Sequence, residues 1–331
     1  FFFFLVLAGV CMIMVYVVDP LQFVRKSSYE PYWSVEQRYQ NPGVAKNYNY
    51  DTVLLGTSTI ENLRPEEMKP LLGEHSVKLA LSAGSLYEQR LTLQLALRSQ
   101  PVQTVYWGLD YMAFGGPSDR VEEIQGPFPN YFYEQNVWSQ WKYFFNYSSL
   151  KDSVMVLADA LKLRPAYHVQ ETLRNQWLNQ VWFSRERVLQ NYQKVVAGDF
   201  KDAPHTRKYY DAQQHRWPYF KNHIDTNLLP VIAQNPQTEF VLFLPPYTGW
   251  FYRAYWQQEP AAVQEWLLAR TYLVRQASAY PNVRIFDFQS DPRFLWELDR
   301  YMDMLHSDKE MTLQIFAEMK QGKRQLTMEN V

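Results

Sequence analysis

Short apolar runs alternate with helix-like stretches along most of this 331-residue chain, and the alternation restricts the folds that are open to it. The runs are rich in β-branched and aromatic side chains, which is typical of strands buried on both faces. They are Thr52–Leu55, Val77–Leu81, Thr104–Trp107, Glu239–Leu244 and Val283–Phe286. Because helix-like stretches separate several of them, the sequence predicts an α/β fold with a doubly wound, mostly parallel five-stranded sheet.

The helix-like stretches between the runs are Pro65–Leu72, Leu86–Arg98 and Ala261–Ala279. Residues 115 to about 225 contain no apolar run of the same quality, and they are rich in Trp, Tyr and Gln. Two helices are expected there, over Leu150–Leu163 and Val169–Val195. We therefore expect a helical insertion at about 115–225, which either shapes a substrate site or is only a packing subdomain.

The first 18 residues contain no charged side chain. As a helix they would extend roughly 27 Å, close to the hydrocarbon thickness of a bilayer. The sequence thus predicts a transmembrane anchor over residues 1–18, a juxtamembrane connector over 19–50 and a domain over 51–331. One alternative is a cleaved signal peptide, although Asp19-Pro20 after Val18 makes a poor cleavage site. Another is a lipoprotein signal at Cys11, although Val10 stands where a small residue is expected. Because the chain opens with Phe, further residues are expected upstream.

Charge and motif content exclude several classes of function. The formal net charge is -1, which gives no reason to expect a nucleic acid partner. Cys11 is the only cysteine, so the domain has neither an intrachain disulfide nor a thiolate metal site. His205 and His215 lack a carboxylate at helical spacing, so no metal site is expected. The absence of G-x-S-x-G, Walker A and H-E-x-x-H sequences argues against elbow-type α/β-hydrolases, P-loop NTPases and zincins.

Ser58 directly follows the first expected strand, in Val53-Leu54-Leu55-Gly56-Thr57-Ser58. In open α/β sheets, functional sites lie at the carboxyl ends of the strands. A serine at the start of a helix there lies near backbone N–H groups that can stabilise an oxyanion. The alternative is that Ser58 only caps the helix.

Asp303 and His306 lie near the C-terminus and are three residues apart. An acyl-transfer serine needs a base, and the base needs an orienting carboxylate. On a helical turn this spacing puts both side chains on one side. Ser307 and Glu310 form a capping-box pattern before an expected helix over Asp308–Lys320. The alternative is a solvated pair at the start of that helix.

Together, the two blocks resemble those of the SGNH (GDSL-like) hydrolase superfamily, over about residues 51–320. Gly56-Thr57-Ser58 resembles the first block of the family, with Thr57 where Asp is common, and Asp303-Met304-Leu305-His306 resembles the last. The resemblance implies that Ser58 is the nucleophile, that His306 is general base and then acid, and that Asp303 orients His306. It implies no cofactor.

The middle blocks of the family supply oxyanion donors from a glycine and an asparagine. Gly84 resembles the glycine, but Asp110 stands where the asparagine is expected. Because an ionised carboxylate cannot donate a hydrogen bond, Asp110 either points elsewhere, is protonated, or leaves the task to the Ser58 and Gly84 amides. Tyr247 follows the fourth strand and either lines an acyl pocket or belongs to a rigid loop.

With its expected anchor and its departure from the family pattern at Asp110, the chain looks most like the envelope-modifying branch of the superfamily, which includes alginate O-acetyltransferase-like and DltD-like proteins. The resemblance implies a serine esterase or O-acyltransferase acting on cell-envelope glycans through an acyl-enzyme. It also implies a membrane-bound O-acyltransferase as partner, and a single-pass protein of the bacterial cell membrane with its catalytic domain on the periplasmic or extracellular side. The alternative, favoured by Asp110, is a non-catalytic protein that binds an envelope polymer or a partner.

Overall fold

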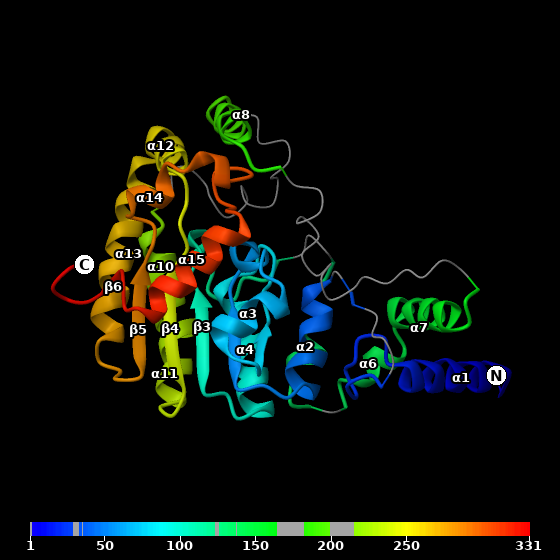
Figure 1. The fold of residues 1–331 in the computed structure, drawn as a ribbon. Helices are drawn as coiled ribbons and strands as arrows, with labels where there is room; N and C mark the ends of the chain where they lie inside the picture. The colour runs from blue at the N-terminus through cyan, green and yellow to red at the C-terminus, as the bar shows by residue number, and fades with distance from the viewer. Residues whose placement is uncertain are drawn as a thin grey trace.

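A computed structural model of the chain describes residues 2–28, 33–34, 36–122, 126–136, 138–163, 182–198 and 215–331. Its centre is a six-stranded sheet in the order β2-β1-β3-β4-β5-β6 (Figure 1). The strands are β1 (Thr52–Leu55), β2 (Ser76–Lys78), β3 (Thr104–Gly108), β4 (Glu239–Leu244), β5 (Val283–Asp287) and β6 (Gln325–Leu326). Neighbours among the first five strands pair in parallel, and β6 pairs antiparallel with β5.

The prediction of a five-stranded sheet is wrong, because β6 completes a mixed sheet of six strands. β6 has only two residues, and both are partly buried. So short a strand leaves no apolar run and no period in the sequence. The other five strands form at the apolar runs, and β2 ends at Lys78 rather than Leu81.

Helices cover both faces of the sheet, because successive strand residues point to opposite sides. On β3, Tyr106 packs edge-to-face against Phe316 of α15 (Lys309–Lys320), with ring centroids 5.6 Å apart. The next residue, Trp107, points the other way and donates through Nε1 to Gln89 Oε1 of α4 (Leu86–Ser99) at 2.7 Å. The strands are therefore buried on two sides, which accounts for their continuous apolar runs.

Further helices before β4 are α1 (Phe2–Val18), α2 (Gln37–Asn47), α3 (Pro65–Leu72), α5 (Asn130–Tyr133), α6 (Trp141–Phe144), α7 (Tyr147–Ala160), α8 (Arg185–Val196), α10 (Trp217–His223) and α11 (Leu229–Gln234). After β4 come α12 (Gly249–Gln258), α13 (Pro260–Ala277) and α14 (Pro292–Leu295). Shorter helical turns are η1 (Ser58–Ile60), η2 (Tyr111–Phe114), η4 (Ile224–Leu228) and η5 (Leu298–Arg300). Residues 169–181 of the expected helix Val169–Val195 lie outside the described residues.

The predicted transmembrane helix over residues 1–18 is wrong. In the part of the chain that the structure describes, no helix combines the length and the apolar character needed to cross a membrane. The segment does form a helix, α1, but it has 17 residues and packs along α6 and α7 (Figure 1). The predicted single-pass placement in the bacterial cell membrane, with a periplasmic or extracellular domain, depended on this helix and is overturned with it.

Residues of the expected connector 19–50 pack closely on the sheet domain. α2 lies against α4, and Arg38 Nε forms an ion pair with Glu88 Oε1 at 2.8 Å, with both side chains buried. Asn41 Nδ2 donates to Ala80 O at 2.9 Å, in the segment that follows β2. α2 thus holds the chain at the carboxyl end of β2, next to the edge where Ser58 lies.

Candidate active site

Ser58, His306 and Asp303 form a continuous hydrogen-bonded chain. Ser58 Oγ lies 2.8 Å from His306 Nε2. The other ring nitrogen, Nδ1, lies 2.7 Å from Asp303 Oδ2. This is the order of contacts that a nucleophile, a base and an orienting carboxylate require.

The carboxyl end of β1 positions Ser58. All four β1 residues are buried, and the chain leaves the sheet through Gly56 and Thr57. Thr57 is the N-cap of η1, and its side chain accepts a long hydrogen bond from the Thr59 amide at 3.5 Å. Ser58 is therefore the first residue of a helical turn at the sheet edge.

A closed loop positions Asp303 and His306. Tyr301 and Ser307 form an isolated antiparallel bridge, and Met302 N donates to His306 O at 3.0 Å. Inside the loop, Asp303 Oδ1 accepts the His306 amide at 2.8 Å and the Leu305 amide at 2.7 Å. The carboxylate therefore has one oxygen fixed by the backbone and the other directed at the imidazole.

The predicted capping box at Ser307 and Glu310 is replaced by a cap one residue further on. α15 begins at Lys309, and its N-cap is Asp308, whose Oδ1 accepts the Met311 amide at 2.7 Å. Ser307 is instead held in the bridge to Tyr301. The helix start is still directly after the loop that carries His306, so the cap anchors that loop.

Charge controls the two titrating members of this site. Burial alone would lower the pKa of His306, but the charge and hydrogen bond of Asp303 outweigh it and raise that pKa to about 9. Asp110 and Glu61 act in the same direction. Burial would raise the pKa of Asp303, but the charge of His306 and three hydrogen bonds hold it below its usual value. The pair thus favours a carboxylate beside an imidazolium in the resting protein.

Asp110 is buried, and both of its carboxylate oxygens accept hydrogen bonds from neighbouring protein groups. Its Oδ2 accepts the Thr57 hydroxyl at 2.6 Å, and its Oδ1 accepts the Tyr247 hydroxyl and the Met112 amide, each at 2.8 Å. All three contacts bring a proton to the carboxylate. Of the three alternatives for Asp110, this geometry fits a side chain that points elsewhere.

Gly84 and Tyr247 both form hydrogen bonds within the protein rather than presenting a free polar group to a substrate. The Gly84 amide donates to Leu81 O at 2.8 Å and closes a turn, in which Ala83 has φ +52°. Tyr247 has no exposed surface, and its hydroxyl is shared between Asp110 and the Tyr111 amide, which donates to it at 2.8 Å. In this conformation, Gly84 offers no free amide proton to an oxyanion. Tyr247 is fully buried and holds Asp110 in place through its hydrogen bond to Oδ1.

Asn62 is a residue of the site that sequence reasoning missed. Its buried Nδ2 donates to Ser307 O and to Thr312 Oγ1, both at 2.8 Å. Asn62 lies just after η1, so these two bonds tie the segment that carries Ser58 to the segment that carries His306. The two segments are 245 residues apart in sequence, and no short motif could have revealed the tie.

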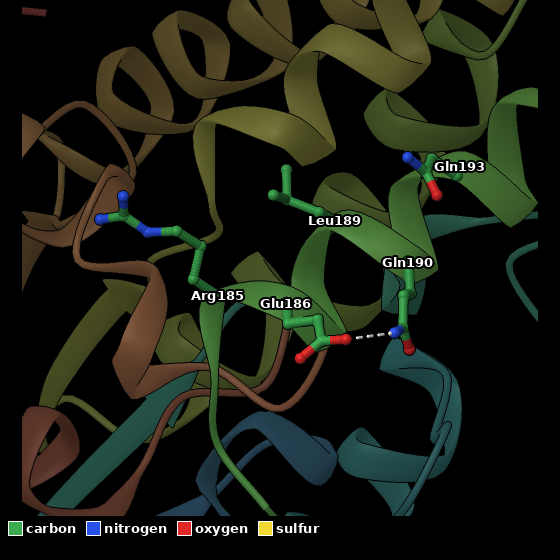
Figure 2. A pocket seen from close by; sticks show the side chains of 5 residues that line it. All are labelled: Arg185, Glu186, Leu189, Gln190 and Gln193. Atoms are coloured by element: carbon green, nitrogen blue, oxygen red, sulfur yellow. Dashed lines mark hydrogen bonds between the residues drawn. The ribbon is translucent and has the colours of Figure 1, made fainter.

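A pocket lined by residues of α8 includes none of the candidate catalytic residues, although other residues of α8 contact the loop that carries Asp303 and His306. α8 contacts the loop through Arg187 Nε, which donates to Met302 O at 3.3 Å, and Asn191 Oδ1, which accepts the Met304 amide at 3.4 Å. Glu186 and Gln190 on the helix bond to each other at 3.0 Å. The side chains that line the pocket are Arg185, Glu186, Leu189, Gln190 and Gln193 (Figure 2).

Of the two histidines considered for metal binding, the structure describes only His215. His215 Nδ1 lies 2.8 Å from Glu265 Oε1 and is largely exposed. His205 lies outside the described residues. Within the described ranges, no group of three His, Cys, Asp or Glu side chains is arranged to hold a metal ion.

Comparison with known proteins adds little to this geometry. No family model matches the chain, and no curated protein matches it. Among solved structures, a protein from Streptococcus pneumonia, described provisionally as a platelet activating factor, is similar with a TM-score of 0.39 and 11% sequence identity. The similarity covers 86% of this chain and 90% of that chain. A likeness at this level carries no argument about activity, so the resemblance to SGNH hydrolases stays a prediction.

Proposed function

We propose that the chain is a serine acyl esterase or O-acyltransferase that works through an acyl-enzyme on Ser58. The observation that supports this proposal is the pair of contacts on the His306 ring, 2.8 Å to Ser58 Oγ and 2.7 Å to Asp303 Oδ2. A histidine that touches a serine through one nitrogen and a carboxylate through the other has its tautomer and orientation fixed for taking the serine proton.

In the proposed reaction, Ser58 Oγ attacks the carbonyl carbon of an ester while its proton passes to His306 Nε2. The tetrahedral intermediate collapses, His306 returns the proton to the departing oxygen, and the acyl group remains on Ser58. Water or an acceptor hydroxyl then attacks the acyl-enzyme, with His306 first as base and then as acid. Asp303 keeps its charge throughout and stabilises the imidazolium.

We further propose cell-envelope glycans as the class of acyl acceptor or acyl-bearing substrate. The support for this finer statement is the Asp110 departure, the part of the resemblance to the envelope-modifying branch of the SGNH superfamily that does not depend on the expected anchor. A membrane-bound O-acyltransferase partner has the same support.

Turnover of p-nitrophenyl acetate by the full chain tests the proposed chemistry. The proposal expects a burst of nitrophenol and a protein that carries one acetyl group on Ser58, located by peptide mass spectrometry. Adding an O-deacetylated glycan tests the acceptor, since a transferase would move the acetyl group to a sugar hydroxyl. No burst and no acetyl group on Ser58, in protein that is shown to be folded, would contradict the proposal.

A second candidate is a non-catalytic binding protein. It is favoured because neither family position for an oxyanion donor offers a proton. The Gly84 amide donates to Leu81 O, and the Asp110 carboxylate only accepts. Loss of one oxyanion donor typically costs about 10²–10³ in turnover, so two losses could silence a triad. Binding of an envelope polysaccharide that is equal in wild type and Ser58→Ala, without acyl transfer, would favour this candidate.

A further inference from the structure

Asp110 is hydrogen-bonded to the residue that directly precedes the nucleophile in sequence. The Thr57 hydroxyl donates to Asp110 Oδ2 at 2.6 Å, and Thr57 is the residue before Ser58. Both side chains are almost fully buried, with 2% of Thr57 and 4% of Asp110 exposed. A short hydrogen bond to a carboxylate in such surroundings is one of the stronger kinds in proteins.

The other side of the Asp110 carboxylate is fixed just as closely. Tyr247 and the Met112 amide both donate to Oδ1 at 2.8 Å. Burial, followed by the charge of Asp110, raises the pKa of Tyr247 well above its usual value, so the phenol stays protonated and donates. Tyr247 in turn accepts the Tyr111 amide at 2.8 Å. Asp110 therefore has little freedom to turn, and neither does the hydroxyl that it holds.

The charge of Asp110 also acts on the base of the triad. Together with Asp303 and Glu61, it favours the positively charged form of His306. That form arises during acyl transfer, when His306 accepts the Ser58 proton. A fixed negative charge is thus present where positive charge develops, and it needs no reorganisation during the reaction.

We propose that Asp110 is a positioning residue of the Ser58 centre: it holds the Ser58 segment through the Thr57 hydroxyl, and its charge stabilises the imidazolium of His306. This inference rests on the proposed acyl transfer at Ser58. An oxyanion donor would present a proton to the substrate, whereas the three contacts of Asp110 all point protons at its carboxylate. Asp110 therefore has a different task from the expected asparagine, since it holds the segment of the nucleophile and does not bind the oxyanion.

Asp110→Asn distinguishes a positioning residue from a position where an oxyanion donor has been lost, because the amide removes the charge and supplies a donor. The positioning role predicts that the maximal rate of fluorophosphonate labelling of Ser58, reached at high pH where His306 is neutral, falls by about 10- to 100-fold, since small displacements of a nucleophile have effects of this size. It also predicts that the pH midpoint of labelling falls, because His306 loses one of the charges that raise its pKa. If Asp110 instead marks a lost oxyanion donor, the asparagine would supply that donor and the maximal labelling rate would rise.

Thr57→Val and Thr57→Ser are the matched variants. Valine has nearly the shape of threonine but removes the hydroxyl, so labelling should slow while the pH midpoint stays that of the wild type. Serine keeps the hydroxyl and should restore the rate. Thermal unfolding shows which variants are folded, and the Thr57 pair carries the test if Asp110→Asn does not fold. A maximal labelling rate that is unchanged in Thr57→Val, or higher in Asp110→Asn, overturns the inference.

Imidazole titration by NMR keeps this test separate from the proposed function. The His306 resonance is identified by its loss in His306→Gln, and its pKa is compared between wild type and Asp110→Asn. A fall of that pKa supports the electrostatic role of Asp110 even if Ser58 takes no label, in which case the proposed function alone fails. An unchanged pKa overturns the inference even if Ser58 reacts.

Discussion

At the scale of single residues, the site depends on how the Asp303 carboxylate changes the pKa of the His306 imidazole. His306 must be neutral to accept the Ser58 proton, yet Asp303 raises its pKa to about 9 from an ordinary 6.5. The neutral form therefore becomes the major one only above the raised pKa. We expect Ser58 labelling to increase with pH through the range from about 7 to 10, with a midpoint near the pKa of about 9. A rate that is already constant by pH 7 would contradict this assignment of the base.

Replacing Asp303 by asparagine tests the orienting role directly. The asparagine side chain can keep a contact to the ring, but it lacks the charge and favours the wrong tautomer of His306. The labelling rate of Asp303→Asn should fall by about 10⁴-fold at its optimum, and its pH midpoint should move down. Mass sampling of quenched aliquots over several hours measures so slow a rate. A rate within a factor of about ten of the wild type would show that Asp303 is not the orienting group.

At the scale of elements, the site joins η1 to the loop before α15. Asn62 makes this connection with bonds of 2.8 Å to Ser307 O and Thr312 Oγ1. Asn62→Ala leaves both buried acceptors without this donor, at an expected cost of about 1–3 kcal/mol in the free energy of unfolding. Urea denaturation measures that cost. Asn222→Ala is a matched control, because Asn222 makes an exposed bond to Ser118 Oγ and should change stability by less than about 0.5 kcal/mol.

The elements also show which parts of the fold a single sequence can predict. Five strands lie at the apolar runs because burial on both faces leaves a continuous signal, whereas the two residues of β6 leave none. That Ser58, Asp303 and His306 lie in contact could be predicted, because the proposed acyl-transfer site needs these residue types after a strand and at a spacing of three. The orientation of Asp110 and the turn at Gly84 could not, because hydrogen bonds that no short motif encodes decide both.

At the scale of the whole molecule, residues before β1 are part of the packed structure. Arg38 of α2 pairs with Glu88 of α4 at 2.8 Å, and Glu88 also accepts the Ser85 and Glu122 amides. Arg38→Ala would leave the Glu88 carboxylate buried without its ion-pair partner, at an expected cost of about 3–5 kcal/mol in unfolding free energy. Chemical denaturation checks this value.

Lys309→Ala is the control for that prediction. It removes the 2.9 Å pair between Lys309 and Glu67, which is much more exposed, and should cost no more than about 1 kcal/mol. Equal losses in the two variants would show that the Arg38 pair does not hold α2 to the sheet domain as described.

The central claim is that His306 activates Ser58 as a nucleophile. Fluorophosphonate labelling of the full chain, read by intact mass for wild type, Ser58→Ala and Ser85→Ala, tests it most directly, because the probe needs only an activated serine. Ser85 is a matched control because it is a buried helix cap on α4. The account predicts one adduct on wild type and Ser85→Ala, and none on Ser58→Ala. An unlabelled but folded wild type, or an adduct that persists in Ser58→Ala, would contradict it.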